Sequence, residues 1–221
     1  MRKRFVLLFG AWAMLAPFVV SAANDPVMTQ IEELQRQWAI VNYQTGDADK
    51  QAAFEQLVAQ AEKLTTDNPL RAEPKVWEAI IRAGLAGAMG GLSSLFNAMP
   101  QMEQGRDLLL AAEGIDPTVL NGSVYTTLGS FYYMVPGGLL GYGDDDKAQA
   151  YLEKALQIAP DDMDANYFMG DYWRDQGKPE LAKPYFEKVL TLPDVAGRPV
   201  YSQGRKAEAT AKLAEVNAKL G

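Results

Sequence analysis

The chain has 221 residues, a formal net charge of −7, and neither cysteine nor histidine. Without these two residue types it can form no disulfide, no zinc site of the usual kind and no Ser-His or Cys-His nucleophile pair. Its acidic balance also disfavours binding to nucleic acid or to anionic lipid.

The first 23 residues have the pattern of a secretory signal peptide. Basic residues from Arg2 to Arg4 precede an apolar run from Phe5 to Val20 and a small-residue cleavage site at Ser21-Ala22-Ala23. We expect cleavage after Ala23, with cleavage after Ala22 or an uncleaved membrane anchor as the alternatives. No cysteine can carry a lipid, and no later apolar run reaches the ~20 residues of a membrane span. The sequence therefore predicts a soluble periplasmic protein without stable membrane insertion.

Residues 24–221 are expected to form a single domain that begins with two helices. Apolar side chains recur at helical intervals in Met28–Tyr43 and again in Ala52–Leu64. Asp25 or Thr29 can cap the first helix, because their side-chain oxygens can accept from free backbone amides. Together the two helices resemble a degenerate repeat that caps one end of a helical array.

A third helix is predicted to begin at Glu73-Pro74 and to continue into a glycine-rich segment. Ala83, Gly87 and Gly91 recur there every four residues. This spacing favours close helix packing over a cofactor-binding glycine loop, because no strand precedes it and no Gly-Lys-Ser/Thr follows. The next helix is predicted over Gln101–Glu113, after a long insertion around Ser93–Met102.

Two segments, residues 122–160 and 163–194, repeat one pattern of small and large residues. The matched pairs are Gly129/Gly170, Tyr132/Trp173, Ala148/Ala182, Leu152/Phe186 and Pro160/Pro193, and Gly105, Leu109, Ala112 and Pro117 continue the pattern upstream. This is the spacing of the tetratricopeptide repeat (TPR), a helix–turn–helix unit of about 34 residues. The predicted fold class is therefore all-α, a TPR-like helical-repeat solenoid with inserted inter-helix loops and a C-terminal capping helix at about residues 203–220.

The turn inside the first of these two units is replaced by a longer loop, MVPGGLLGYGDD. Apolar residues in a glycine-rich loop usually pack against something or bind something. We interpret this loop and its flanks as a site for a ligand or a partner protein. The candidate binding residues are Tyr133, Pro136, Leu139, Leu140 and Tyr142, of which the leucines and Tyr142 are expected to be exposed.

Runs of carboxylates could suggest metal binding or acid–base catalysis. Asp144-Asp145-Asp146 and Asp161-Asp162 each precede a helix, where aspartate caps free amides and complements the helix dipole, and neither run has the ligand spacing of a calcium loop. Asp171 with Glu180 or Glu187 is better interpreted as solvated surface than as a catalytic pair. We therefore predict no metal site, no cofactor and no catalytic residue.

Several segments of the chain resemble the T component of tripartite ATP-independent periplasmic (TRAP) transporters. They are FYYMVPGGLLGYGDDDKAQAYLEKAL and ANYFMGDYWRDQGKPELAKPYFEKVL, followed by Gly197-Arg198-Pro199, Gly204-Arg205 and Glu208. The resemblance covers roughly Leu108–Val216. It implies a periplasmic helical-repeat protein that associates with the transporter's solute-binding subunit and forms oligomers with a ligand-lined pore. Tyr167 and Arg198 join the candidate binding residues.

The sequence favours a non-enzymatic protein that binds a partner protein, a small apolar ligand, or both. The expected partner is a periplasmic solute-binding subunit or another envelope protein, and the chain could also form a homo-oligomer. The alternative is a general cell-envelope scaffold that holds peptide segments in a concave TPR groove. An enzyme is the least favoured reading, because no catalytic constellation is found.

Overall fold

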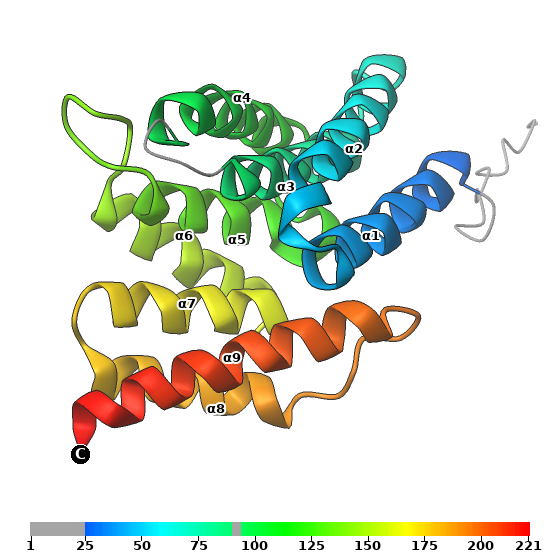
Figure 1. Cartoon of the computed structure of the whole chain (residues 1–221). Helices are drawn as coiled ribbons and strands as arrows, with labels where there is room; N and C mark the ends of the chain where they lie inside the picture. Colours follow the sequence, from blue (N-terminus) through cyan, green and yellow to red (C-terminus); the bar gives the residue numbers. More distant parts are fainter. Residues whose placement is uncertain (1–24, 90–93) are drawn as a thin grey trace, which may run out of the picture.

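The computed structural model describes residues 25–89 and 94–221, so the expected signal peptide and Gly91 lie outside the described residues. The described parts fold into nine α-helices (Figure 1). Their bounds are α1 Pro26–Gln44, α2 Asp47–Asp67, α3 Ala72–Ala88, α4 Ser94–Ile115, α5 Val119–Met134, α6 Asp145–Ile158, α7 Met163–Asp175, α8 Pro179–Thr191 and α9 Pro199–Leu220. Among these helices, none has both the length and the apolarity needed to cross a bilayer.

Three helices begin at aspartates that cap them. The side chains of Asp25, Asp144 and Asp162 accept hydrogen bonds from the backbone amides of Val27, Lys147 and Ala165 at 2.8–3.0 Å. Each bond satisfies one of the donors that a helix start leaves free. The capping role predicted for Asp144 and Asp162 is therefore confirmed.

Consecutive helices form antiparallel hairpins, α3/α4, α5/α6 and α7/α8, and in α5/α6 and α7/α8 the two helices meet closely at a glycine. A Cβ added to Gly129 on α5 would lie 2.6 Å from Leu152 Cγ on α6, and one added to Gly170 on α7 would lie 3.0 Å from Phe186 Cε1 on α8. Both glycines and both large side chains stand at predicted repeat positions, and the structure shows that they contact each other within one unit. These contacts between repeat positions confirm the repeat alignment.

The sequence assigned the close helix contact at the glycine-rich end of α3 to the wrong glycine. A Cβ on Gly87 would meet nothing within 4 Å, whereas one on Gly84 would lie 2.4 Å from the Phe54 ring of α2. The close helix contact that the small residues indicate therefore exists, but it is made by Gly84. Spacing alone could not distinguish the two glycines, because the choice depends on where Phe54 lies.

The long insertion predicted around Ser93–Met102 is also wrong in the part that the structure describes. Helix α4 begins at Ser94 and continues through Pro100 to Ile115. A proline inside a helix removes one backbone hydrogen bond and crowds the preceding turn. Packing of α4 along α3 outweighs this local cost, as tertiary contacts commonly do for weak local preferences.

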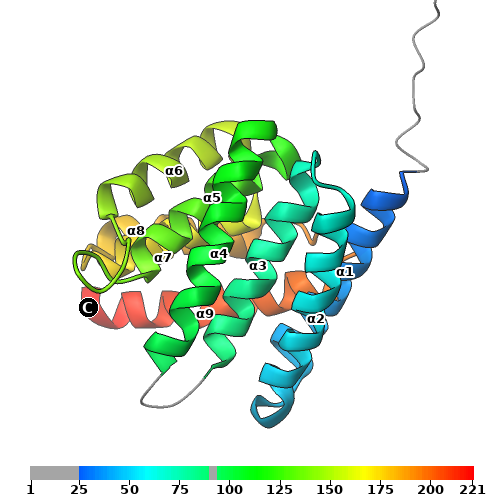
Figure 2. The ribbon, with the colours of Figure 1, turned by 90° about the horizontal axis from the view of Figure 1, so that it is seen from above.

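The helix α9 brings the two ends of the array together. It packs against α7 and α8 and also reaches α1 (Figures 1 and 2). Gly204 lies under the Tyr43 ring of α1, where an added Cβ would be 2.4 Å from Tyr43 Cδ2, and the Tyr43 hydroxyl donates to Glu208 at 3.2 Å. The predicted capping helix therefore does more than cover the last repeat, because it closes the concave side of the array against the first helix.

Candidate functional site

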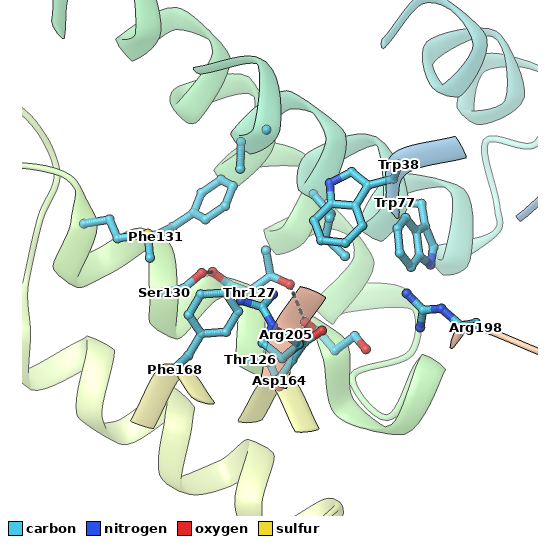
Figure 3. A pocket seen from close by; sticks show the side chains of 15 residues that line it. Trp38, Trp77, Thr126, Thr127, Ser130, Phe131, Asp164, Phe168, Arg198 and Arg205 are labelled. Carbon is cyan, nitrogen blue, oxygen red and sulfur yellow. Dashed lines mark hydrogen bonds and ion pairs between the residues drawn. The ribbon is translucent and has the colours of Figure 1, made fainter. Parts of the chain in front are cut away.

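The closed array surrounds a central cavity of about 130 Å³ (Figure 3). Its walls come from alternate helices, α1, α3, α5 and α7, and from α9 with the residue before it. The lining residues are Trp38, Trp77, Ile80, Ala83, Gly84, Ser123, Thr126, Thr127, Ser130, Phe131, Met134, Asp164, Phe168, Arg198 and Arg205. The first helix of each repeat therefore faces the cavity.

Aromatic side chains dominate two opposite walls of the central cavity. Figure 3 shows Trp38 and Trp77 on one side and Phe131 and Phe168 on the other. The two tryptophan rings meet edge to face, with centroids 6.3 Å apart. Such walls suit an apolar occupant, because burying its surface is favourable and the rings are already held in place.

Hydroxyl groups of α5 form a polar strip between these walls. The hydroxyls of Ser123, Thr127 and Ser130 donate to backbone carbonyls of their own helix, at 2.6, 2.8 and 2.8 Å. The Thr126 side chain is buried on the same helix and also lines the cavity. The cavity is therefore apolar at its sides and carries hydroxyl groups on α5.

A buried arginine, Arg205, lies at the α9 side of the cavity. Its Nε is 2.7 Å from Asp164 Oδ1, and its Nη1 donates to Glu208 at 2.6 Å. Its guanidinium also lies 4.3 Å from the Tyr167 ring centroid and 5.0 Å from that of Phe168. Two carboxylates thus neutralise Arg205, which leaves it little capacity for a further anion.

The pKa of Asp162, whose carboxyl caps α7, is shifted by its buried and charged surroundings. Burial, and then repulsion by Asp164, raise the pKa of Asp162 to about 6. Hydrogen bonds from the amides of Ala165 and Asp164 oppose this rise. Asp162 caps its helix but does not line the central cavity.

The candidate Arg198 lines the cavity, whereas Tyr133 and Tyr167 lie behind its walls. The Tyr133 hydroxyl donates to Asp171 at 3.0 Å, and burial, with the negative charge of Asp171, raises the pKa of Tyr133. Tyr167 is 7% exposed and packs against Phe168 and Phe186. These two tyrosines therefore support the site and do not face it.

The glycine-rich loop projects from the end of the α5/α6 hairpin (Figure 1). Its neck is closed by a hydrogen bond from the Gly143 amide to the Pro136 carbonyl at 3.0 Å and by a backbone bridge between Gly137 and Gly143. Leu139 and Leu140 at its tip are 106% and 65% exposed. The two leucines are thus presented to solvent, as the sequence predicts.

The expectation that Tyr142 is exposed beside these leucines is wrong. Its hydroxyl donates to the Met102 carbonyl at 3.0 Å, its ring meets that of Tyr132 edge to face, and the Arg106 guanidinium lies 4.4 Å from its centroid. Tyr142 therefore anchors the base of the loop to α4 and α5. A tyrosine at a loop end can turn either way, and its direction depends on α4, which is distant in sequence.

A second, more open cleft of about 720 Å³ lies between α1 and the segment before α9. It is lined by Glu32, Gln35, Arg36, Ala39, Ile40, Gln44 and residues 195–201. We call it the outer cleft. Arg198 lines both the outer cleft and the central cavity, so this arginine marks the boundary between them.

Sequence reasoning missed most of the cavity residues. It gave Trp38, Trp77 and Phe168 no place among the candidate binding residues. A usable indication was present, since aromatic residues recur on the first helix of each unit. What could not be read was that α9 would fold back to α1 and enclose them.

One comparison with known proteins, a match to a family model, agrees with the helical hairpins. Residues 142–162 and 164–194 match the model of the tetratricopeptide repeat. A crystal structure of a thermophilic TPR protein from Thermus thermophilus is 16% identical, with 81% of this chain and 99% of that chain covered, at a TM-score of 0.41. No curated protein matches. The chain therefore contains tetratricopeptide repeats, a fold that generally mediates binding between proteins.

Proposed function

We propose that the chain is an exported, non-catalytic TPR protein that binds a small apolar ligand in its central cavity and a partner protein through its projecting loop. The observation that carries this proposal is the closed array, in which α9 meets α1 and encloses an aromatic-walled cavity. Pockets of this kind, mostly apolar with a few convergent polar groups, are the usual form of small-molecule sites.

The partner in this proposal is the periplasmic solute-binding subunit of an uptake system, as the resemblance to TRAP T components suggests. The two leucines at the loop tip support a contact with another protein, because Leu139 is fully exposed and most of Leu140 is exposed too. An extended peptide in the concave groove is less well supported. Helix α9 occupies that side of the array, and about 130 Å³ holds a single side chain or small molecule but not a peptide strand.

Replacing Leu139 tests the partner surface. We expect Leu139→Ser to weaken binding to the solute-binding subunit about tenfold or more, because one apolar contact at an interface is typically worth about 1–3 kcal/mol. The free energy of unfolding should change by less than about 0.5 kcal/mol, since the side chain is fully exposed. Titration calorimetry of the purified pair and thermal denaturation followed by circular dichroism measure the two quantities.

Leu70 provides a matched control, because it is also an exposed leucine, at 85%, but lies between α2 and α3. Leu70→Ser should leave partner binding unchanged. A photo-crosslinking residue at position 139, but not at position 70, should capture the subunit in intact cells. Equal capture at both positions, or unchanged affinity after Leu139→Ser, would remove the loop from the proposed interface.

A further inference from the structure

Three buried N–H donors at the central cavity make no hydrogen bond to the residues that the structure describes: Nε1 of Trp38, a side chain that is 7% exposed, Nε of Arg198 and Nε of Arg205. Arg205 Nε still has a carboxylate oxygen of Asp164 at 2.7 Å, which leaves Trp38 and Arg198. Both residues line the cavity (Figure 3). Buried donors without a partner are rare and unfavourable in folded proteins, so the cavity is prepared for an acceptor that a ligand brings.

The charge of Arg198 indicates what kind of acceptor this is. Each of the other arginines in the described part of the chain has a carboxylate within 4 Å, but Arg198 has none. Its guanidinium lies 4.1 Å from the Tyr201 ring centroid and 5.5 Å from that of Trp77. The Arg198 guanidinium, packed on these rings, lies at the boundary between the central cavity and the outer cleft, because Arg198 lines both.

The remaining lining limits the ligand to one negative charge. Among the described residues no lysine lines the cavity, and Arg205 is already neutralised by Asp164 and Glu208. A single free guanidinium matches a single carboxylate, which can accept two parallel hydrogen bonds from it. A phosphate dianion would need further cations that the lining does not supply.

We propose that the central cavity binds an apolar group that carries one carboxylate, with the carboxylate on Arg198 and the apolar part between the aromatic walls. This deepens the proposed function and rests on it. A dry cavity of about 150 Å³ accommodates a benzene ring, so the apolar part has about six heavy atoms. Such a group can be a free short-chain or aromatic acid, or the C-terminal residue of a peptide that enters from the outer cleft.

The test compares a carboxylate with its uncharged amide. The probes are 4-methylvalerate and 4-methylvaleramide, and the tripeptide Ala-Ala-Leu with a free or an amidated C-terminus. We expect the full exported chain to bind the better of the two acids about tenfold more tightly than its amide, a difference of about 1.4 kcal/mol. In nuclear magnetic resonance titrations, the Arg198 Nε–H signal should move further with acid than with amide. The acid that binds more tightly identifies the source of the ligand.

Variants assign the carboxylate to Arg198. Arg198→Gln should reduce the acid's affinity to that of the amide and leave the amide's affinity unchanged, while Arg198→Lys should restore part of the preference. Arg36→Gln is the control, because Arg36 lines the outer cleft but not the central cavity. Melting temperatures of all three variants should match that of the parent protein.

Three outcomes would overturn the proposal. Equal affinity of acid and amide would leave an apolar pocket without a carboxylate site, and the proposed function would stand. Loss of the preference in Arg36→Gln but not in Arg198→Gln would move the anion to the outer cleft. Failure of every probe to bind would remove both this ligand class and the central cavity as a binding site.

Discussion

Arg82→Met is expected to lower the free energy of unfolding by about 3–5 kcal/mol, the usual loss when one partner of a buried ion pair is removed. Arg82 and Glu78, one turn apart on α3, are 6% and 3% exposed. Arg82 Nη2 lies 2.7 Å from Glu78 Oε1, and its Nη1 donates to Gln101 of α4 at 2.8 Å. The substitution leaves Glu78 charged, buried and without its cation. Urea denaturation followed by circular dichroism measures the loss.

Two controls separate this mechanism from a general effect of losing an arginine. The double substitution Glu78→Leu with Arg82→Leu removes both charges and should recover most of the stability, because no unpaired charge remains. Arg36→Met removes the cation of an exposed pair with Glu33 and should cost less than about 1 kcal/mol. If Arg82→Met cost no more than Arg36→Met, the α3 pair would not be buried as described.

Gly129→Leu and Gly170→Leu should each lower the free energy of unfolding by about 2–4 kcal/mol, because a bulky side chain must enter a filled helix–helix contact. Gly129→Leu should have the larger effect. Its Cβ would lie 2.6 Å from Leu152 Cγ and 3.2 Å from the Ala148 carbonyl oxygen, whereas the Gly170 Cβ would approach only the Phe186 ring, at 3.0 Å. Thermal and urea denaturation of the two variants measure both the size and the order of the effects.

Gly87 on α3 is the matched control for these substitutions. It is also a helical glycine, but an added Cβ there would meet nothing within 4 Å. Gly87→Leu should therefore leave stability within about 0.5 kcal/mol or raise it slightly, since leucine favours the helix more than glycine does. Equal losses at all three glycines would mean that the measured effect is one of helix propensity and not of packing between repeat helices.

The hairpins α5/α6 and α7/α8 could be predicted because the residues that pack within each hairpin are close together in the sequence and recur at fixed intervals. Gly129 faces Leu152 and Gly170 faces Phe186 within one repeat, so small and large positions recur at fixed intervals. The same reasoning failed at Gly84 and Gly87, where the contact is with Phe54 on another hairpin. The insertion predicted around Ser93–Met102 failed in its described part, because α4 continues through Pro100.

The candidate site could be predicted only in part, for the same reason. Leu139 and Leu140 are exposed because the glycines that flank them form a neck within a few residues, and this is a local feature. The cavity depends instead on Gly204 of α9 meeting Tyr43 of α1, more than a hundred residues apart. The resemblance around Arg198 named one residue of the cavity but not Trp38, which is far from Arg198 in the sequence and lines the same cavity.

The central claim is that the closed array binds an apolar group in its central cavity, and a titration with uncharged 4-methylvaleramide tests it most directly. Saturable shifts are predicted for the indole N–H signals of Trp38 and Trp77, which line the cavity, and not for that of Trp173, which does not. Ala83→Leu fills part of the cavity, so it should weaken binding about tenfold or more without lowering the melting temperature. Unchanged binding in Ala83→Leu, or shifts confined to Trp173, would contradict the claim.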